Sequence, residues 1–326
     1  MTMTRTIAAL ISAVLTTCAI GSANAADDYP NRPITFVVPF AAGGSTDANA
    51  RFLARFLKDR LGQSVVIENK PGAGSLVGAE YVANAKPDGY TFLYGSNTNL
   101  VTFEYIAKKH SYNPRTGLLP FHGLLQAPPT LMARTDAPFK TVPELVAYAK
   151  ANPDKVNYAT PGYNSSPHLA MELFMGEAGL RMTHIPYKGE SLAGADMLKG
   201  LVDIIFVYPQ PFQGLIESGK LRLIGVPGAQ RLPGQTDVPT FAEMGLPGVI
   251  YSNWAIMTLP PGTPAPIVAK LTDAFDKVLK EPEVAKFFAD QGATLMPITG
   301  KTIADFLEGE RVRIKGIVTR ANIQPE

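Results

Sequence analysis

Two short loops carry most of the residues that could do chemistry in this sequence, and the chemistry they suggest is anion binding. Residues 40–47 and residues 160–166 both end in hydroxyl, amide or carboxyl side chains that suit the start of a helix. A helix start presents unpaired backbone N–H groups and about half a positive charge, which together can hold a carboxylate. Neither loop contains Lys or Arg. Either loop alone is better explained as an ordinary helix cap formed by Ser45, Thr46 or Asp47, or by residues 164–166. The presence of two such loops predicts a reversible anion site.

Further polar and aromatic residues stand near these loops in the predicted arrangement. His168 lies just inside the second helix and is either a ligand contact or a helix-face histidine hydrogen-bonded to a neighbouring loop. Tyr163 and Tyr208 lie in loops that follow strands, where open α/β sheets bind ligands, and Phe212 and Trp254 are expected beside them. The candidate ligand-binding residues are Phe40, Ala41, Gly43, Gly44, Ser45, Thr46, Ser96, Asn97, Gly162, Tyr163, Asn164, Ser165, Ser166, His168 and Tyr208.

Other kinds of active site find little support. Residues 70–78 contain three glycines after a strand, but the third stands one position late for a dinucleotide loop and no acidic ribose-binding residue clearly follows. No G-x-S-x-G nucleophile elbow occurs, and the four histidines have no metal-ligand spacing. Asp47 and Asp203 are not an evident acid/base pair. We therefore expect no catalysis, no cofactor and no metal.

Length and charge limit the classes of protein that remain. The chain has 326 residues, enough for about two domains. Its 30 basic and 28 acidic residues create no field that would attract nucleic acid or an anionic membrane. We expect a monomeric protein that binds a small molecule.

The first 25 residues have the form of a secretory signal peptide. A basic start at Arg5 is followed by an apolar run, residues 7–20, and by the small-residue end Ala23-Asn24-Ala25. The run is shorter than the roughly 20 residues needed to cross a bilayer, so we expect a soluble, exported chain, located in a periplasm or in an extracellular space. Cys18, the single cysteine, would leave with the peptide, and lipidation at this residue is the alternative.

The elements that must position the loops alternate between strand and helix from Pro33 onward. This order is typical of an α/β protein with mostly parallel sheets. Residues 34–38 predict a buried strand, followed by the first loop and an amphipathic helix that ends at Gly62. The second half repeats this order with strand 156–159, the second loop and another helix. Residues 96–99 predict a polar loop. We expect two similar lobes that face each other across a cleft.

Seven short motifs stand in a fixed order over nearly the whole chain after residue 28. They are Tyr29-Pro30-x-Arg32-Pro33-Ile34, Val38–Asp47, Glu68–Gly74, Pro87–Thr91, Pro186–Gly189, Asp237–Glu243 and Pro260–Pro264. Each motif alone is weak, but the ordered set resembles the substrate-binding proteins of tripartite tricarboxylate transporters, the Bug family.

The resemblance implies a two-lobed α/β periplasmic binding protein of the Venus-flytrap type, with a mostly parallel sheet flanked by helices in each lobe. Lobe 1 would comprise residues 26–127 and 253–326, and lobe 2 residues 128–252, with hinge crossings near residues 126–129 and 252–254. The resemblance also implies a small organic acid as ligand and a membrane permease with one large and one small subunit as partner. In the family the ligand carboxylate is held by the same two loops, often through ordered water. Residues 71–74 are then expected to be an ordinary turn outside the site.

Departures from the family pattern bear on specificity. Pro161, Tyr163 and Pro167 make the second loop stiffer and bulkier than in many relatives, and residues 207–210 replace an often smaller or more acidic stretch. These features indicate a carboxylate with a ring or a long apolar body rather than citrate. Two other functions stay open at this point: presentation of the ligand to a membrane sensor kinase, and secreted enzyme activity with an unrecognised nucleophile.

Overall fold

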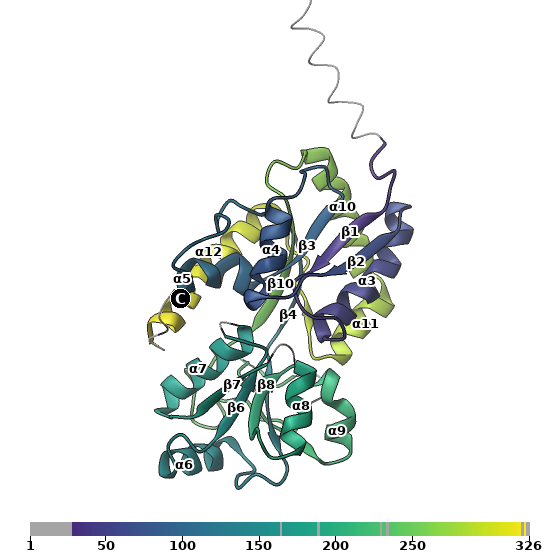
Figure 1. The fold of residues 1–326 in the computed structure, drawn as a ribbon. Coiled ribbons are helices and arrows are strands. Elements are labelled where there is room, and N and C mark those ends of the chain that lie inside the picture. Colours follow the sequence, from purple (N-terminus) through teal and green to yellow (C-terminus); the bar gives the residue numbers. More distant parts are fainter. Residues whose placement is uncertain are drawn as a thin grey trace, which may run out of the picture.

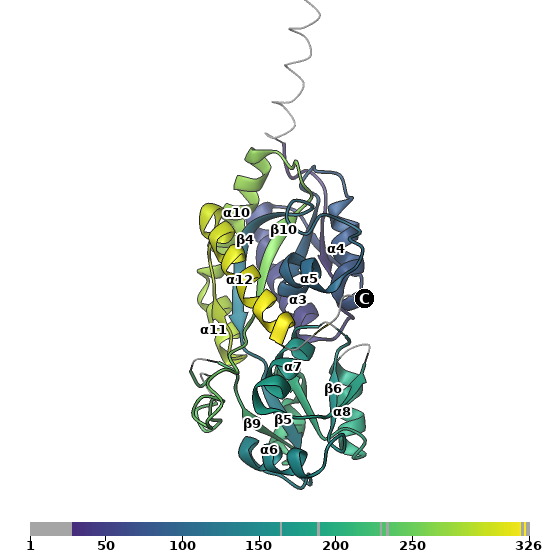
Figure 2. The same ribbon diagram turned by 90° about the vertical axis from the view of Figure 1, so that its left-hand side faces the viewer.

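Two lobes, each built on one β-sheet, follow one another along the long axis of the molecule (Figures 1 and 2). The structure is a computed structural model, and it describes residues 28–163, 165–187, 190–228, 230–232, 235–320 and 323. We call the part with the six-stranded sheet the first lobe and the part with the five-stranded sheet the second lobe. The two-lobed α/β fold predicted from the sequence is confirmed.

The sheet of the first lobe is mixed. Parallel pairs join β2, β1 and β3, whereas β10 runs antiparallel to both β3 and β4. The sheet is therefore not mostly parallel as expected, because β10 returns from the second lobe and lies between β3 and β4. In the order β11-β4-β10-β3-β1-β2, its strands are Thr294–Leu295, Leu119–Ala127, Asn253–Leu259, Thr91–Ser96, Ile34–Val38 and Val65–Asn69.

Helices cover both faces of this sheet. Side chains alternate along β1, so Phe36 and Val38 pack in a cluster with α3, α10 and α11, while Val37 packs with α4, α5 and α12 on the opposite face. Gly62 ends α3 in the left-handed conformation at φ 68°, as its position in the sequence predicts. The helices are α3 (Ser45–Leu61), α4 (Leu76–Ala83), α5 (Phe103–Ile106), α10 (Ala265–Leu279), α11 (Pro282–Asp290) and α12 (Gly300–Arg320).

The second lobe repeats the layered arrangement on a smaller scale. In β5, Leu131 and Ala133 face α6 and α7, while Met132 faces α8 and α9. Its sheet is also mixed, because β5 runs antiparallel to both neighbours. In the order β7-β6-β8-β5-β9, the strands are Thr183–Pro186, Asn157–Thr160, Ile204–Val207, Thr130–Arg134 and Leu221–Gly225. The helices are α6 (Val142–Ala151), α7 (Ser166–Ala178), α8 (Glu190–Leu198) and α9 (Gln213–Glu217).

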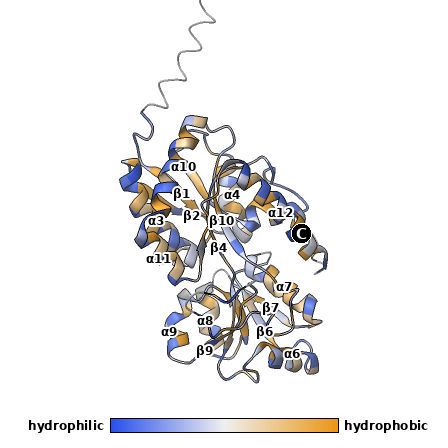
Figure 3. Cartoon of the chain, turned by 180° about the vertical axis from the view of Figure 1, so that it is seen from behind, coloured by the Kyte–Doolittle hydropathy of each residue, from blue (hydrophilic) through white to orange (hydrophobic). Residues whose placement is uncertain are grey.

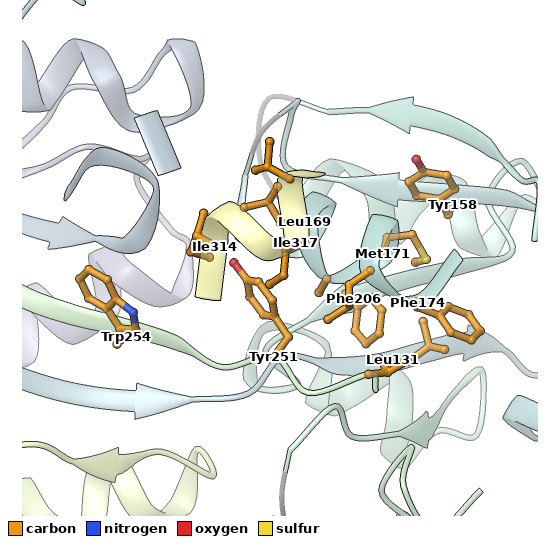
Figure 4. Close-up of a cluster of buried hydrophobic side chains, with 14 of the residues drawn as sticks. Leu131, Tyr158, Leu169, Met171, Phe174, Phe206, Tyr251, Trp254, Ile314 and Ile317 are labelled. Atoms are coloured by element: carbon orange, nitrogen blue, oxygen red, sulfur yellow. The ribbon is translucent and has the colours of Figure 1, made fainter. Parts of the chain in front are cut away.

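The C-terminal helix joins the two lobes. α12 begins in the first lobe and runs down to α7 of the second (Figure 2). There Ile314 and Ile317 share one buried cluster with Leu169 of α7 and with Tyr251, which precedes β10 (Figure 4). The hydrophobic core is therefore continuous from one lobe to the other on this side of the molecule.

Hydropathy follows the layers. Hydrophobic residues concentrate on the central strands, and hydrophilic residues on the outer turns of the helices (Figure 3). Within the described ranges, no helix is long and apolar enough to span a membrane.

The predicted polar loop at residues 96–99 is wrong. Ser96 ends β3, and a helical turn over Thr98–Thr102 (η2) follows it, with all these residues buried. The signal peptide predicted at residues 1–25 lies outside the described residues.

Candidate functional site

A cavity of about 920 Å³ lies between the two lobes and is lined by residues from both. The first lobe contributes residues 39–42 and 44–46, residues 71–76 and the ends of β3, β4 and β10 that face the second lobe. The second lobe contributes residues 161–163, the start of α7, and side chains that follow β7 and β8. The cavity is therefore at the carboxyl ends of β1 and β6, where open α/β sheets bind their ligands.

The first loop brings an uncapped helix start to the cavity. Gly43 has a φ of +83°, which turns the chain so that Gly44 becomes the residue before α3. Because Gly44 has no side chain to cap the helix, the backbone N–H groups of Ser45 and Thr46 have no capping partner there. The prediction that Ser45, Thr46 or Asp47 caps this helix is wrong.

Asp47 instead holds the loop in shape from behind. Its Oδ2 accepts hydrogen bonds from the Gly43 N–H at 3.0 Å and Arg51 Nε at 2.9 Å, and its Oδ1 accepts one from Asn69 Nδ2 at 2.9 Å. Burial raises the pKa of this carboxyl, but the three hydrogen bonds outweigh burial and hold the pKa below its usual range. The charge of Asp47 is thus balanced by Arg51, and neither residue lines the cavity.

The second loop brings another uncapped helix start. Ser165 precedes α7, but its Oγ donates to the carbonyl of Gly162 at 2.7 Å and makes no capping hydrogen bond. Ser166 Oγ donates to Tyr251 Oη at 2.9 Å. The prediction that these side chains cap the helix is therefore wrong for Ser165 and Ser166, and Asn164 lies outside the described residues. The N–H groups at this end of α7 are available to a ligand.

The wall of the cavity is electrically neutral. Among the described residues that line it, none is an Asp, Glu, Lys, Arg or His. Phe40, Tyr163, Tyr208 and Trp254 provide aromatic surface, with Tyr163 half exposed at 53% and Trp254 buried at 1%. The two helix starts are thus the main source of positive potential in the cavity, about half a charge each.

Asn97 lies behind the cavity and links the lobes. Its Nδ2 donates to Tyr251 Oη at 2.9 Å, the same oxygen that Ser166 Oγ contacts from the second lobe. Burial raises the pKa of Tyr251 to about 12, so the phenol stays neutral in this network. The hydroxyl of Tyr251 therefore connects the end of β3 with the start of α7.

His168 also lies behind the cavity wall. Its ring is 4.7 Å from the ring of His184 (centroid to centroid), and Tyr163 packs edge-on against both. Burial lowers the pKa of His168 to about 3, with a further contribution from the charge of His184, and burial lowers the pKa of His184 to about 4. Both rings are neutral at neutral pH, so they contribute no positive charge to the site.

Most candidate residues from the sequence come together at the cavity. Gly43, Asn97 and His168 are not among the lining residues, and Phe212 packs in the core of the second lobe instead of beside the cleft. The candidate residues that line the cavity are Phe40, Ala41, Gly44, Ser45, Thr46, Ser96, Gly162, Tyr163, Ser165, Ser166 and Tyr208. Their role as ligand contacts stays a prediction.

The sequence analysis missed several lining residues. The loop from Pro71 to Leu76 lines the cavity and is not the ordinary turn expected for residues 71–74. A signal for this existed, because the two glycines of this loop, directly after a strand, permit close approach of the backbone to a ligand. Asn49 could have been found one helical turn after Ser45. Further missed residues include Tyr94, Thr98, Tyr187, Leu192 and Asn253.

Comparison with known proteins assigns the family. The model of the tripartite tricarboxylate transporter family receptor, TctC, matches residues 49–323. The solved structure of the periplasmic binding protein BugD is 33% identical, with a TM-score of 0.86, over 91% of this chain and 100% of that one. An R. palustris protein solved with adipate is 31% identical, with a TM-score of 0.87, over 92% and 100% of the two chains.

A further structure, MatC from Rhodopseudomonas palustris with bound malate, is 31% identical, with a TM-score of 0.83, over 89% of this chain and 100% of that one. The family model and these whole-chain similarities agree with the fold and with the motif order in the sequence. The chain belongs to the tripartite tricarboxylate transporter receptor family, TctC or Bug, whose members are periplasmic solute-binding proteins and not enzymes.

Proposed function

We propose that this protein captures a small organic carboxylate with a ring or a long apolar body and delivers it to a tripartite tricarboxylate-type membrane transporter. The observation that carries the proposal is the meeting of two helix starts, α3 and α7, at one cavity, with neither start capped by a side chain. A carboxylate between them would accept hydrogen bonds from both lobes at once. Binding would therefore favour the closed arrangement of the lobes.

The neutral wall supports a ligand of low charge. Two helix starts supply about one positive charge in total, and the cavity has no cationic side chain to balance more. Citrate would bring three negative charges out of water with little compensation, which is costly. Aromatic surface from Phe40, Tyr163 and Trp254 suits an apolar body. Adipate and malate, found with two of the similar proteins, are both organic carboxylates.

Two steps would bring the ligand to the transporter: export of the protein to the periplasm and closure of its two lobes over the ligand. Residues 1–25 would direct the chain to the periplasm and be removed. The lobes, residues 26–127 with 253–326 and residues 128–252, would close by a hinge at the two connections between the sheets, as periplasmic binding proteins do. The closed, loaded form is the one we expect a permease with one large and one small subunit to recognise.

A proline substitution tests the helix-start site directly. Ser45→Pro removes one backbone N–H, and proline is accepted at this first helical position because Gly44 before it is already extended, at φ −85° and ψ 172°. A lost hydrogen bond to a charged group costs about 1.5–3 kcal/mol, so we expect carboxylate affinity to fall about 10- to 100-fold in isothermal titration calorimetry.

Two matched variants separate the contributions. Ser45→Ala keeps the N–H and removes only the hydroxyl, so it should weaken binding less than Ser45→Pro. Lys301→Pro places the same residue near the exposed start of α12, away from the cavity, and should leave binding unchanged. Calorimetry would use a panel of benzoate, hexanoate, adipate, malate and citrate. If none of these acids bound, or if Ser45→Pro kept the affinity of the unaltered protein, the proposed site would be wrong.

A further inference from the structure

Gly74 of the first lobe meets Tyr163 of the second lobe at the cavity wall. Both residues line the cavity. A Cβ added to Gly74 would lie 3.3 Å from the backbone carbonyl oxygen of Tyr163, which is closer than an ordinary van der Waals contact. A side chain at position 74 would therefore hold the two lobes further apart at this point.

Gly74 belongs to a turn with an uncommon backbone conformation. Four consecutive residues have a positive φ: Gly72 at 133°, Ala73 at 45°, Gly74 at 64° and Ser75 at 92°. We call residues 72–75 the positive-φ turn. Ala73 and Ser75 are not glycines, and this conformation costs them free energy unless the surrounding structure fixes it. Backbone strain of this kind is concentrated at ligand clamps and switch regions.

Asn99 supplies contacts that fix the positive-φ turn. Its side chain is fully buried, with Nδ2 donating to Ser75 Oγ at 3.2 Å and Oδ1 accepting from the Ser96 N–H at 3.0 Å. Ser96 is the last residue of β3, so the amide links the turn to the sheet of the first lobe. The hydroxyl of Tyr112 donates to the backbone carbonyl of Asn99. Asn99 does not line the cavity, so it can act on a ligand only through the residues that it holds.

We propose that Asn99 is a positioning residue for ligand capture: it holds the positive-φ turn in the conformation that lets Gly74 approach Tyr163 when the lobes close. The proposal rests on the carboxylate binding and the hinge closure proposed above. The Asn99 amide offsets the strain of the turn, and the missing side chain of Gly74 leaves room for the Tyr163 carbonyl. Binding favours the closed arrangement only if the lobes can meet, so the fit at Gly74 contributes to ligand affinity.

Gly74→Ala tests the contact between the lobes, and Gly219→Ala is its matched control. The two glycines have nearly the same φ, 64° and 69°, so alanine strains the backbone similarly at both positions. A Cβ at Gly219, in the second lobe after α9, meets nothing within 4 Å. We therefore expect both variants to lower the melting temperature by similar amounts and only Gly74→Ala to weaken binding.

Two measurements separate affinity from closure. Calorimetry would use whichever of benzoate, hexanoate, adipate, malate and citrate binds the unaltered protein most tightly. Affinity should fall about tenfold in Gly74→Ala, which corresponds to about 1.4 kcal/mol, and stay unchanged in Gly219→Ala. Small-angle X-ray scattering should show a smaller ligand-induced decrease in the radius of gyration for Gly74→Ala than for the control.

A rescue experiment tests the role of Asn99. Asn99→Ala removes both side-chain hydrogen bonds and should also weaken binding about tenfold. Ala73→Gly removes part of the strain that Asn99 offsets, so adding this change should restore part of the affinity. A purely structural role would lower the melting temperature without this rescue. If Asn99→Ala does not fold, Ser75→Ala takes its place, since it removes only the acceptor for Asn99 Nδ2.

The outcomes distinguish this proposal from carboxylate binding itself. Equal affinities of Gly74→Ala and Gly219→Ala would overturn the closure contact, and a lack of rescue by Ala73→Gly would overturn the positioning role of Asn99. Carboxylate binding would stand in either case. If no acid of the panel bound the unaltered protein, both the carboxylate site and the closure proposal would be wrong.

Discussion

Acidification should destabilise the second lobe through the buried pair His168 and His184. The folded protein holds both rings neutral, because burial lowers the pKa of His168 to about 3 and that of His184 to about 4. The unfolded chain takes up these protons near pH 6.5. The folded state therefore loses stability as the pH falls below about 6.5, and the loss levels off only below the folded pKa values.

The size of the effect follows from the proton occupancies. Between pH 7 and pH 5, a histidine with a pKa of about 3 in the folded protein and 6.5 when unfolded contributes a loss of about 2 kcal/mol. Glu172 acts in the opposite direction: burial raises its pKa against a hydrogen bond from Tyr158, so its protonation favours the folded state as the pH falls. Glu172 lies 3.6 Å from His168 Nε2, so the two contributions must be separated by variants.

The assay is urea unfolding at pH 7 and at pH 5, and the quantity compared is the change in unfolding free energy between the two. His168→Gln should lose about 2 kcal/mol less than the unaltered protein over this interval. His110→Gln, which removes an exposed histidine of the first lobe, should behave as the unaltered protein. Glu172→Gln should increase the loss. An identical loss in the unaltered protein and in His168→Gln would refute the reasoning.

Three further changes test the site and the fold. Ser45→Ala and Ser166→Ala should each weaken carboxylate binding by about 1–2 kcal/mol, or about 5- to 30-fold in calorimetry, and unchanged affinity in both would move the site elsewhere. Tyr251→Phe removes the hydroxyl that joins the lobes and should lower the unfolding free energy in urea by about 1–3 kcal/mol, whereas no change would mean that this link is not stabilising. Gly95→Ala would place a Cβ 2.4 Å from the carbonyl oxygen of Ile256 and should sharply lower the melting temperature. The control is Gly176→Ala in α7, where the added Cβ meets open space and should raise the melting temperature slightly. Equal effects of the two variants would contradict the packing of β3 against β10.

Local patterning was enough to predict the elements that carry the site. The apolar run at residues 34–38, the periodic face of α3 and the stop at Gly62 are each determined by near neighbours, and the structure has all three. The helix starts at residues 45 and 166 were located only to within one or two residues, because loop composition marks the region but not the first helical residue. Prediction was reliable wherever contacts within a few residues decide the conformation.

Long-range contacts account for what the sequence analysis missed. Whether Ser45 or Gly44 precedes α3 depends on the hydrogen bond from Gly43 to the Asp47 carboxylate, which Asn69 of a neighbouring strand also holds in place. The meeting of Ser96 and Asn253 at the cavity depends on the pairing of β3 with β10, strands about 160 residues apart. No periodicity within either segment encodes that register.

The packing of α12 against α7 makes the C-terminal end of the chain relevant to ligand binding. Ile314 and Ile317 contact the same helix whose first turn borders the cavity, and Tyr251 in that cluster also contacts Ser166 (Figure 4). Truncation within the last turns of α12 would remove support from the start of α7 without touching a lining residue. Expression vectors for this protein should therefore leave α12 complete and separate any purification tag from it by a flexible linker, since a shortened chain could fold and still report a falsely weak affinity.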